Sequence, residues 1–587
     1  MQIQAREIAR APLSLITRLR LVLFGHEDLA GIIFWAALVG VCGALASVAF
    51  REGIRLLELI FTGQTMGLVN GASRLVWWHR AIVPVIGGVL SGWVLYVLGS
   101  RFVSLKVVDY MEAVLVGDGR ISFRGTLLRS VSSLLTIASG GSIGREGSMV
   151  QLSAMIASRV GRLARAPVPR LRLLVACGGA AGIAAAYNAP ISGALFVSEI
   201  VLGSLSMETF GPLVVASVIS DATIHRFLGY GPVFTVPHVE FASNWELIFY
   251  IVLGVLLGHL APPFLGLLDF TKGRFVRLRL PLYWQLGLGG LIVGAISIFV
   301  PQVWGNGYSV IGGILGGELL GVWLLAVLAA KVLATSATVG SGAVGGVLTP
   351  TLFIGSAVGA SLGGVLHHLM PTIVSVPAAY ALIGMGGFLS ATTLAPLTSI
   401  LLIFEMTADY EIVLPLMLAC VTAHYTAKVY RNGKSVYHNS LYAAAAVEGG
   451  GDDWRLRTVE MLVKPAAAVV PDTTTLAELF EKLPKRPIDR VFVVQGNDLI
   501  AWLNPREVME RMHDAKLDGS APVSLVAKPV QFALAPDMPL TTALEAFLRE
   551  QATVLPVTPG QWRNTLLGQV SRSDVMLAIQ DRLTFPK

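Results

Sequence analysis

The chain has 587 residues, of which 54% are hydrophobic and only 14% are charged, and its mean hydropathy is +0.69. This apolar content exceeds what the core of a soluble globular protein requires, so the composition excludes that class. The net charge of +7 does not indicate a nucleic-acid partner, because the basic residues cluster in short loops, as the positive-inside rule for membrane proteins predicts.

The N-terminal residues 1–24 carry several arginines far from any small-residue cleavage site, so we interpret them as a cytoplasmic segment and not as a signal peptide. Apolar runs of membrane-spanning length then recur as far as residue 426. They predict an all-α, multi-pass membrane domain over residues 25–440, with both termini in the cytoplasm. The three cysteines lie in apolar segments, which argues against a disulfide framework and a Cys-rich metal site.

The membrane domain contains an internal repeat. "NAPISGALFVSEI" at 188–200 and "LAPLTSILLIFEM" at 394–406 share an Ala-Pro step and carry a glutamate at the same distance beyond it. In the same order, "GREGS" at 144–148 can be laid over "GVLTP" at 346–350. We therefore predict two inverted halves, at about 30–226 and 245–427, with a transport site where their interrupted helices meet.

Helices that begin in mid-membrane suit an anion, because their first backbone N–H groups are unpaired and carry partial positive charge. Gly144 and Gly147 in the first half, with Gly345 and Gly346 in the second, would let an anion approach the backbone. The alternative is that these glycines only allow close helix packing. Their spacing alone favours neither explanation.

Glu146 stands out because an ionisable group in an apolar span is costly unless it faces water, a partner or an ion path. At a helix start that attracts anions, its carboxylate could take the place of the anion and leave when the anion enters. We therefore predict that Glu146 is a gate. The alternative is a structural ion pair with the neighbouring Arg145.

The composition changes after residue 430, and we predict a linker at 441–454 followed by a soluble α/β tail at 455–587. Two similar units of strand, turn and helix follow each other there, at about 455–513 and 522–583. Pairing the two units would bury their apolar faces.

These motifs together resemble the CLC family of chloride channels and chloride/proton exchangers, over nearly the whole chain. "GREGS" resembles the family pattern GREGP, with Ser148 in place of the usual proline, and "GVLTP" resembles G-[IV]-F-x-P. The resemblance implies chloride or a similar small anion as the substrate, a bacterial inner membrane, a homodimer with one pore per subunit, and a tail of paired CBS domains. It implies an anion path formed by Gly144, Arg145, Gly147, Gly346, Val347, Leu348 and Tyr437, the tyrosine coming from "NGKSVYH".

The chain departs from the family pattern at the first anion-binding loop. The family usually has G-S-G-I-P there, whereas the matching stretch, aligned through Glu112, is "LKVVDYMEA". In that register Lys106 replaces a serine hydroxyl and would raise the occupancy of the pore by anions. The alternative is a lysine that reaches the cytoplasmic surface.

A second departure concerns protons. Exchangers of the family commonly have two adjacent glutamates after the Ala-Pro helix, and the second passes protons from the cytoplasm. This chain has Glu199 followed by Ile200, which cannot titrate, so the inner relay is absent. We therefore expect passive, channel-like conduction, with chloride/proton exchange as the alternative.

In the tail, "GQVSRSDVM" resembles the CBS segment that binds an adenosine nucleotide, through Ser571 and Asp574. The first unit offers only Asn504 and Glu507, so at most one adenine nucleotide site is expected, and packing without a ligand is equally compatible. No tightly bound cofactor is predicted.

Other classes of function fit less well. A zinc protease needs H-E-x-x-H, but the His-Glu pair at His26 and Glu27 lacks the second histidine. His367 and His368 are adjacent and face different sides of a helix, so no metal site is expected. The sequence indicates a transporter and not an enzyme, while a membrane protein that senses nucleotides without transport stays an alternative.

Overall fold

The computed structural model describes residues 29–431 except 66, 99–108, 116, 204, 230, 235–242 and 244, and residues 458–580 except 484–487, 514–517, 531, 551 and 561–564. The chain divides into two compact units, residues 1–440 and 441–587. Two predicted site residues, Lys106 and Tyr437, lie outside the described residues, as do the predicted N-terminal segment 1–24 and linker 441–454.

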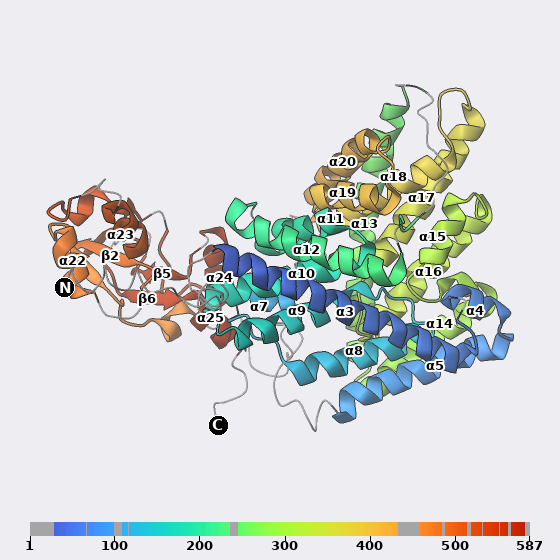
Figure 1. Ribbon diagram of the computed structural model, residues 1–587, viewed down its shortest axis with the longest axis horizontal. Coiled ribbons are helices and arrows are strands. Elements are labelled where there is room, and N and C mark those ends of the chain that lie inside the picture. The colour runs from blue at the N-terminus through green and yellow to red at the C-terminus, as the bar shows by residue number, and fades with distance from the viewer. Residues whose placement is uncertain are drawn as a thin grey trace, which may run out of the picture. The chain divides into compact units, whose positions relative to one another are not determined.

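The first unit is helical (Figure 1), and eight of its described helices are long and apolar enough to cross a membrane. Helices of the first half are α3 (Leu29–Thr62), α4 (Leu68–Arg74), α5 (Trp77–Trp93), α7 (Tyr110–Leu115), α8 (Phe123–Ala138), α9 (Glu146–Leu163), α10 (Val168–Tyr187), α11 (Pro190–Phe196), continued by the π-helical η2 (Val197–Leu202), and α12 (Met207–Leu228). Helices of the second half are α13 (Glu246–Arg277), α14 (Leu282–Phe299), α15 (Tyr308–Leu315), α16 (Val322–Gly340), α17 (Leu348–Leu369), α18 (Pro377–Thr393), α19 (Pro396–Thr407) and α20 (Val413–Arg431).

Corresponding helices of the two halves pack in corresponding ways. α9 packs on α10 as α17 packs on α18, and α3 packs on α12 as α13 packs on α20. The Ala-Pro repeat explains part of this likeness, because Pro190 and Pro396 each occupy the first position of a short helix, where a missing N–H has no cost. In each half the preceding helix ends at a left-handed residue, Asn188 or Leu394, which turns the chain sharply.

Small residues let the central helices of this unit approach closely. All of α18 after its first residue is buried, and so is α10 from Leu174 to Tyr187. A Cβ on Gly355 of α17 would overlap the backbone of Gly384 in α18, so glycine is required at this crossing. The core therefore depends on backbone proximity as much as on large apolar side chains.

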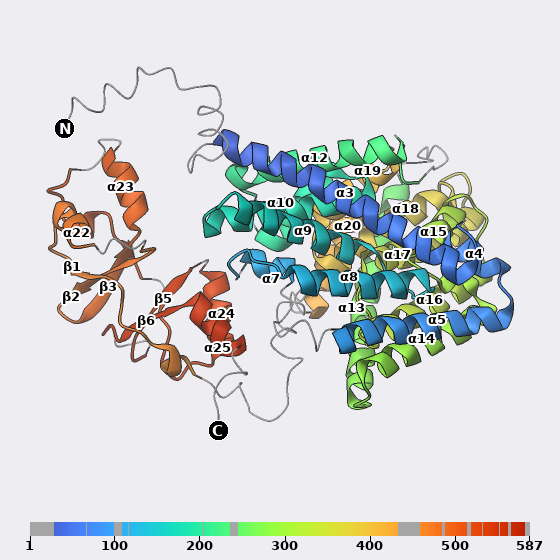
Figure 2. The ribbon, with the colours of Figure 1, turned by 60° about the horizontal axis from the view of Figure 1, so that its bottom comes forward.

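The second unit is α/β. β1 (Val469–Pro471), β2 (Val491–Gln495), β3 (Asp498–Leu503) and β4 (Lys528–Pro529) form a sheet in that order, with β1 parallel to β2 and the other pairs antiparallel. β5 (Val554–Val557) and β6 (Gly568–Ser571) form a separate antiparallel pair. The helices of this unit, visible beside the strands in Figure 2, are α22 (Leu476–Lys482), α23 (Pro505–His513), α24 (Leu540–Arg549) and α25 (Arg572–Gln580).

The strand and helix patterns of the tail explain this arrangement. The run "VFVVQ" is buried at its first four positions, as expected of a central strand, and Gly496 takes a positive φ of 65° in the turn to β3. Chain order repeats as strand, helix, strand, strand, helix, first in β1–α22–β2–β3–α23 and then in β4–α24–β5–β6–α25. Strands and helices thus occur in both predicted units.

Candidate functional site

Two glycines far apart in the sequence join the two halves of the membrane unit. Gly144 N donates a hydrogen bond to Gly346 O over 2.8 Å, and Gly346 N donates to Gly144 O over 2.9 Å. The bond pair forms an isolated antiparallel bridge directly before α9 and α17. The starts of these two helices, which the sequence repeat aligns with each other, therefore meet in the fold.

Glu146, the first residue of α9, places its carboxylate at the start of α17. The residue is 1% exposed, and its Oε1 accepts a hydrogen bond from Thr349 N at 2.9 Å. Its buried Oε2 has no hydrogen-bond partner in the described structure. Because the first N–H groups of a helix attract negative charge, the carboxylate occupies a position suited to a small anion.

The four glycines around Glu146 fall into two pairs, one for each explanation that the sequence left open. A Cβ on Gly144 would overlap the Glu146 carboxylate, and a Cβ on Gly346 would lie 2.9 Å from Glu146 Oε1. These two glycines make room for an anionic group. A Cβ on Gly147 would lie 3.1 Å from Gly346 N, and one on Gly345 would lie 2.7 Å from the Ile143 side chain, so these two allow close packing.

Arg145 points toward a different partner. Its guanidinium carbon lies 5.5 Å from the centre of the Tyr308 ring, at the start of α15. Arg145 and Glu146 are both described, and no ion pair joins them, so the structural ion pair considered from the sequence is not formed. Ser148, which stands where the family usually has proline, donates instead to Ser133 Oγ of α8 at 2.7 Å.

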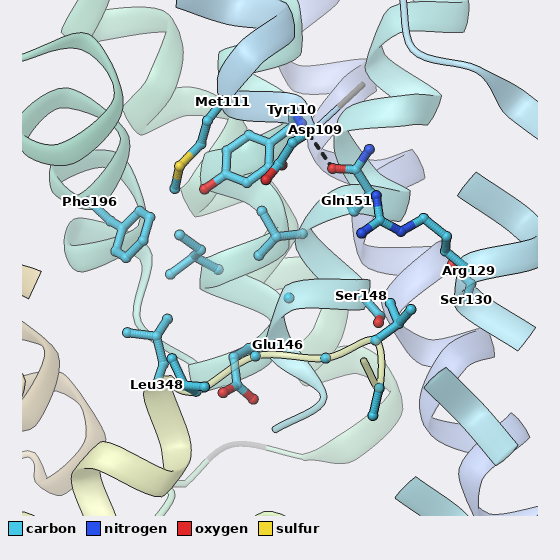
Figure 3. A pocket seen from close by; sticks show the side chains of 18 of the residues that line it. Asp109, Tyr110, Met111, Arg129, Ser130, Glu146, Ser148, Gln151, Phe196 and Leu348 are labelled. Carbon is cyan, nitrogen blue, oxygen red and sulfur yellow. Dashed lines mark hydrogen bonds between the residues drawn. The ribbon is translucent and has the colours of Figure 1, made fainter. Parts of the chain in front are cut away.

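A cavity of about 310 Å³ adjoins Glu146 and brings four of the eight predicted anion-path residues together. Gly147, Gly346, Val347 and Leu348 line it with Glu146 (Figure 3). Val347 precedes α17 and Leu348 begins it, so their N–H groups belong to the helix start that carries partial positive charge. These four residues therefore border an open space at the junction of the two halves, whereas Gly144 and Arg145 do not line it.

The same cavity is lined by polar residues that the sequence reasoning missed: Asp109, Arg129 and Gln151. In the view of Figure 3 these three side chains group at one end of the cavity, with Glu146 and Leu348 toward the other. Gln151 Oε1 accepts a hydrogen bond from Tyr110 N at 2.9 Å, which ties the start of α7 to α9. Asp109 lies in the stretch "LKVVDYMEA", three residues after Lys106.

Glu199, considered from the sequence as a substitute proton carrier, is engaged in a reciprocal contact. Its carboxylate accepts from Leu397 N at 3.2 Å, from Thr398 N at 2.8 Å and from Thr398 Oγ1 at 2.6 Å, all at the start of α19. Glu405 of α19 makes the equivalent three contacts with Ile191 and Ser192 at the start of α11, at 2.6 to 2.8 Å. The two repeated glutamates therefore each cap the short helix of the other half.

Ile200, at the inner relay position, lines a different and much smaller cavity. That cavity measures about 10 Å³ and is also lined by Tyr187, Phe196 and Leu348. This volume is close to the minimum that a single water molecule needs. The position therefore offers neither a titratable group nor a roomy hydrated space.

Lys331 of α16 is a second ionisable residue that sequence reasoning missed. Its side chain is fully buried, and its ammonium group donates to Val303 O at 2.9 Å and to Gly305 O at 2.7 Å. A charged lysine is costly to bury in an apolar run, and backbone carbonyls compensate for this cost here. It holds the loop that leads to α15 and Tyr308.

In the tail, the proposed nucleotide residues are bonded to protein groups. Asp574 Oδ1 contacts Lys464 Nζ at 2.7 Å, and Asp574 N donates to Ser571 Oγ at 3.0 Å. Burial alone would raise the pKa of the Asp574 carboxyl, but hydrogen bonds from Lys464 and Ser571 outweigh it and lower this pKa below its ordinary value. Asn504 and Glu507, the weak counterparts in the first unit, bond to Arg506 N and to Lys528 Nζ.

Within the described residues, no group of three or more His, Cys, Asp or Glu side chains could hold a metal ion. His367 bonds through Nδ1 to the backbone oxygen of Val374.

Comparisons with known proteins point in one direction. A family model described as "Voltage gated chloride channel" matches residues 87–428. The chain is 51% identical over 426 residues to a ClcB-like chloride channel protein of Ralstonia nicotianae, covering 72% of this chain and 98% of the relative. It is 39% identical over 419 residues to the voltage-gated ClC-type chloride channel ClcB of Salmonella dublin, covering 70% of this chain and 98% of the relative.

Two solved structures are similar. A slow cyanobacterial Cl⁻/H⁺ antiporter aligns with a TM-score of 0.63 at 26% identity, over 71% of this chain and 98% of that one. A eukaryotic CLC transporter aligns with a TM-score of 0.63 at 17% identity, over 92% of this chain and 97% of that one, a likeness that concerns the fold alone.

Proposed function

The chain belongs to the voltage-gated chloride channel (CLC) family, and from this premise we propose that it carries chloride across the membrane with Glu146 as its gate. One observation carries the assignment of the gate: the Glu146 carboxylate lies beside the cavity at the start of α17, where Thr349 N donates to Oε1 while Oε2 has no partner among the described residues. A negative group held this loosely at an anion-attracting helix start competes with chloride for the same backbone groups. Chloride passes when the carboxylate leaves or becomes protonated.

The gate is tested by chloride efflux from liposomes that contain the purified protein. Glu146→Gln and Glu146→Ala should leave the flux intact or faster and should remove most of its pH dependence, because neither side chain carries a titratable charge. Glu318→Gln is the matched control, since Glu318 is an exposed acid in a loop. A folded Glu146→Ala protein without flux would refute the gate.

For the mode of transport we propose passive, channel-like conduction. Ile200 cannot titrate, and Glu199 accepts three hydrogen bonds at the start of α19, so neither residue is a ready proton carrier. The ClcB relatives are also named as channels. Moving protons through a low-dielectric interior requires successive titratable groups or waters, and the route past Ile200 supplies few of either.

A second candidate is chloride/proton exchange, which the likeness to the cyanobacterial antiporter at 26% identity favours. The reversal potential separates the two modes in liposomes under a chloride gradient, measured with and without a pH gradient. A passive chloride pathway should reverse at the potential set by chloride alone. A strong shift with the proton gradient would establish exchange instead.

We further propose a homodimer with one pathway per subunit in a bacterial inner membrane, on the strength of the family resemblance. Mass determination of the detergent-solubilised protein tests this assembly, and a monomer that retains full flux would contradict it.

The tail, as paired CBS domains, is proposed to bind an adenine nucleotide through Ser571 and Asp574. Binding would require Lys464 to release the Asp574 carboxylate or to contact the phosphates itself. Calorimetry of the full-length protein with ATP, ADP and AMP tests this proposal, and absence of heat at millimolar nucleotide would leave only a packing role.

A further inference from the structure

Asp109 is an ionisable residue that the proposed gate mechanism does not use. It directly precedes α7, is half-buried, and lines the same cavity as Glu146. Both carboxyl groups therefore border one continuous space, although they come from different elements and are separated by 37 positions in the sequence. A cavity of about 310 Å³ is far larger than the space that a single water molecule needs, so it has room for a chain of waters.

We propose that Asp109 passes protons to and from Glu146 through the water of this cavity. In the forward step, the protonated carboxyl of Asp109 gives its proton to a neighbouring water, a proton passes along the water chain, and the Glu146 carboxylate accepts one. Asp109 then regains a proton from water outside the cavity, so one proton moves and no other bond changes. The proposal rests on the proposed function, because it names the source of the proton that opens the gate.

The surroundings of Asp109 suit repeated protonation better than permanent pairing. Arg129 acts electrostatically on the carboxylate, yet among the described residues no ion pair joins Asp109 to Arg129. Arg129 also lines the cavity, so its positive charge offsets the cost of an acid beside an anion path. Gln151, between them in Figure 3, adds a neutral group that can both donate and accept.

Other charged groups near α7 do not share this position. The elements that pack against α7 are α9, α10 and η2, and Glu112 lies on α7 itself. Of the ionisable side chains on these elements and on α7 itself, Glu146 and the phenol of Tyr110 line the cavity. The remaining members of this set are Glu112, Arg159, Arg162, Arg170, Arg172, Cys177, Tyr187 and Glu199.

The route also avoids the obstacle at Ile200. A relay through η2 would cross the cavity of about 10 Å³ that Ile200 lines, whereas the route from Asp109 crosses the roomy cavity that already reaches Glu146. The inference holds for either mode of transport. In a channel, Asp109 sets how fast the gate is protonated from its side of the cavity, and in an exchanger it carries the coupled proton.

Asp109→Asn is a sharp probe of this role. Asparagine has nearly the same size and shape as aspartate and keeps a polar group at this position, but it cannot titrate. Glu112→Gln is the matched control, because Glu112 lies on the same helix and does not line the cavity. The experiment measures chloride efflux from liposomes between pH 4.5 and 7.5 for both variants, alone and combined with Glu146→Gln.

We expect Asp109→Asn to slow chloride efflux about a hundredfold at acid pH in the wild-type background, the lower end of what the loss of one acid–base group costs. In the Glu146→Gln background the same change should have no effect, because that gate needs no proton. Glu112→Gln should change neither background.

An equal effect of Asp109→Asn in both backgrounds would overturn the proposal, because it would show an action on the chloride path or the fold. Unchanged efflux in the wild-type background would overturn it as well. The experiment also shows separately whether Glu146 is the gate. If it is not, Glu146→Gln would keep the pH dependence of chloride efflux seen in the wild type, both with Asp109 and with Asp109→Asn.

Discussion

Glu146 and the pair formed by Glu199 and Glu405 occupy comparable places, each at a helix start in the opposite half, yet they are held differently. Glu146 is almost fully buried and has one hydrogen bond to the backbone of α17, with Oε2 unpaired beside a cavity. Glu199 and Glu405 are half-buried, and each accepts three hydrogen bonds of 2.6 to 3.2 Å.

The comparison shows that a carboxylate at a helix start is a structural cap when its bonds are complete, and is suited to movement when they are not. Helix starts attract negative charge in all three cases. What differs is the number of donors and the space next to the carboxylate. Glu199 and Glu405 therefore hold the two halves together. The Glu146 carboxylate accepts fewer hydrogen bonds and lies beside a cavity into which it can move.

The largest effect is expected from breaking the reciprocal caps. Glu405→Ala should lower the free energy of unfolding by about 3 kcal/mol, because the N–H groups of Ile191 and Ser192 lose their charged acceptor. Glu199→Ala should cost a similar amount through Leu397 and Thr398. Denaturant unfolding in detergent measures both.

By contrast, Glu146→Ala should leave the free energy of unfolding within about 1 kcal/mol of the wild type, since only one hydrogen bond is lost. A larger loss of stability for Glu146→Ala than for Glu405→Ala would contradict the distinction between gate and cap.

A smaller effect is expected from filling the space around the Glu146 carboxylate. Gly346→Ala places a methyl group 2.9 Å from Glu146 Oε1 and 3.0 Å from Gly147 N, closer than carbon atoms normally approach either atom. The resulting strain of about 1–3 kcal/mol should displace the carboxylate and change chloride efflux about tenfold. Gly364→Ala on the same helix is the control, because a Cβ there meets nothing within 4 Å. Equal efflux in the two variants would show that the geometry around Glu146 is not critical.

The smallest effect is expected at Asp574, a carboxylate in the first turn of α25 that pairs with Lys464 near the surface. Because its pKa is lower in the folded protein than in an unfolded chain, it stabilises the fold above the ordinary aspartate pKa, and this contribution is lost as pH falls through the lowered value. Asp574→Asn should therefore cost less than about 1 kcal/mol at pH 7.

Hydrogen exchange of the backbone amides in α25, measured between pH 3 and pH 7, would detect this difference. The exchange rates of Asp574→Asn and of the wild type should become equal at the acid end of this range. Glu545→Gln, at an exposed acid on α24, should leave the exchange rates unchanged. A gap that widened toward low pH would contradict the sign of the shift.

Much of the site follows from local sequence. The repeat of "GREGS" and "GVLTP" indicated which two helix starts belong together, and the Gly144–Gly346 bridge joins them. Val347 and Leu348 could be placed at the start of α17 by motif, because a motif specifies the local course of the backbone. The shared position of Glu199 and Glu405 was visible in the sequence, but their mutual capping was not.

Side chains that act from a distance could not be found in this way. Asp109, Arg129 and Gln151 come from three separate segments and share one cavity only after folding. The charge of Lys331 is stabilised by two backbone carbonyl groups of a loop 26 and 28 residues away. No pattern in the neighbouring sequence predicts such partners. Lys106 and Tyr437, placed in the anion path by resemblance, stay predictions.

The amino-acid sequence by itself determined the membrane class, the two-part repeat, the helix starts and the α/β tail, because apolar length, proline and glycine act within a few neighbouring residues. Tertiary structure alone decided which carboxylate is bonded completely and which is not. That distinction depends on the hydrogen-bond donors and the empty space that the opposite half of the molecule contributes. Both are set by how α9, α11, α17 and α19 meet, and not by the residues next to each glutamate in the sequence.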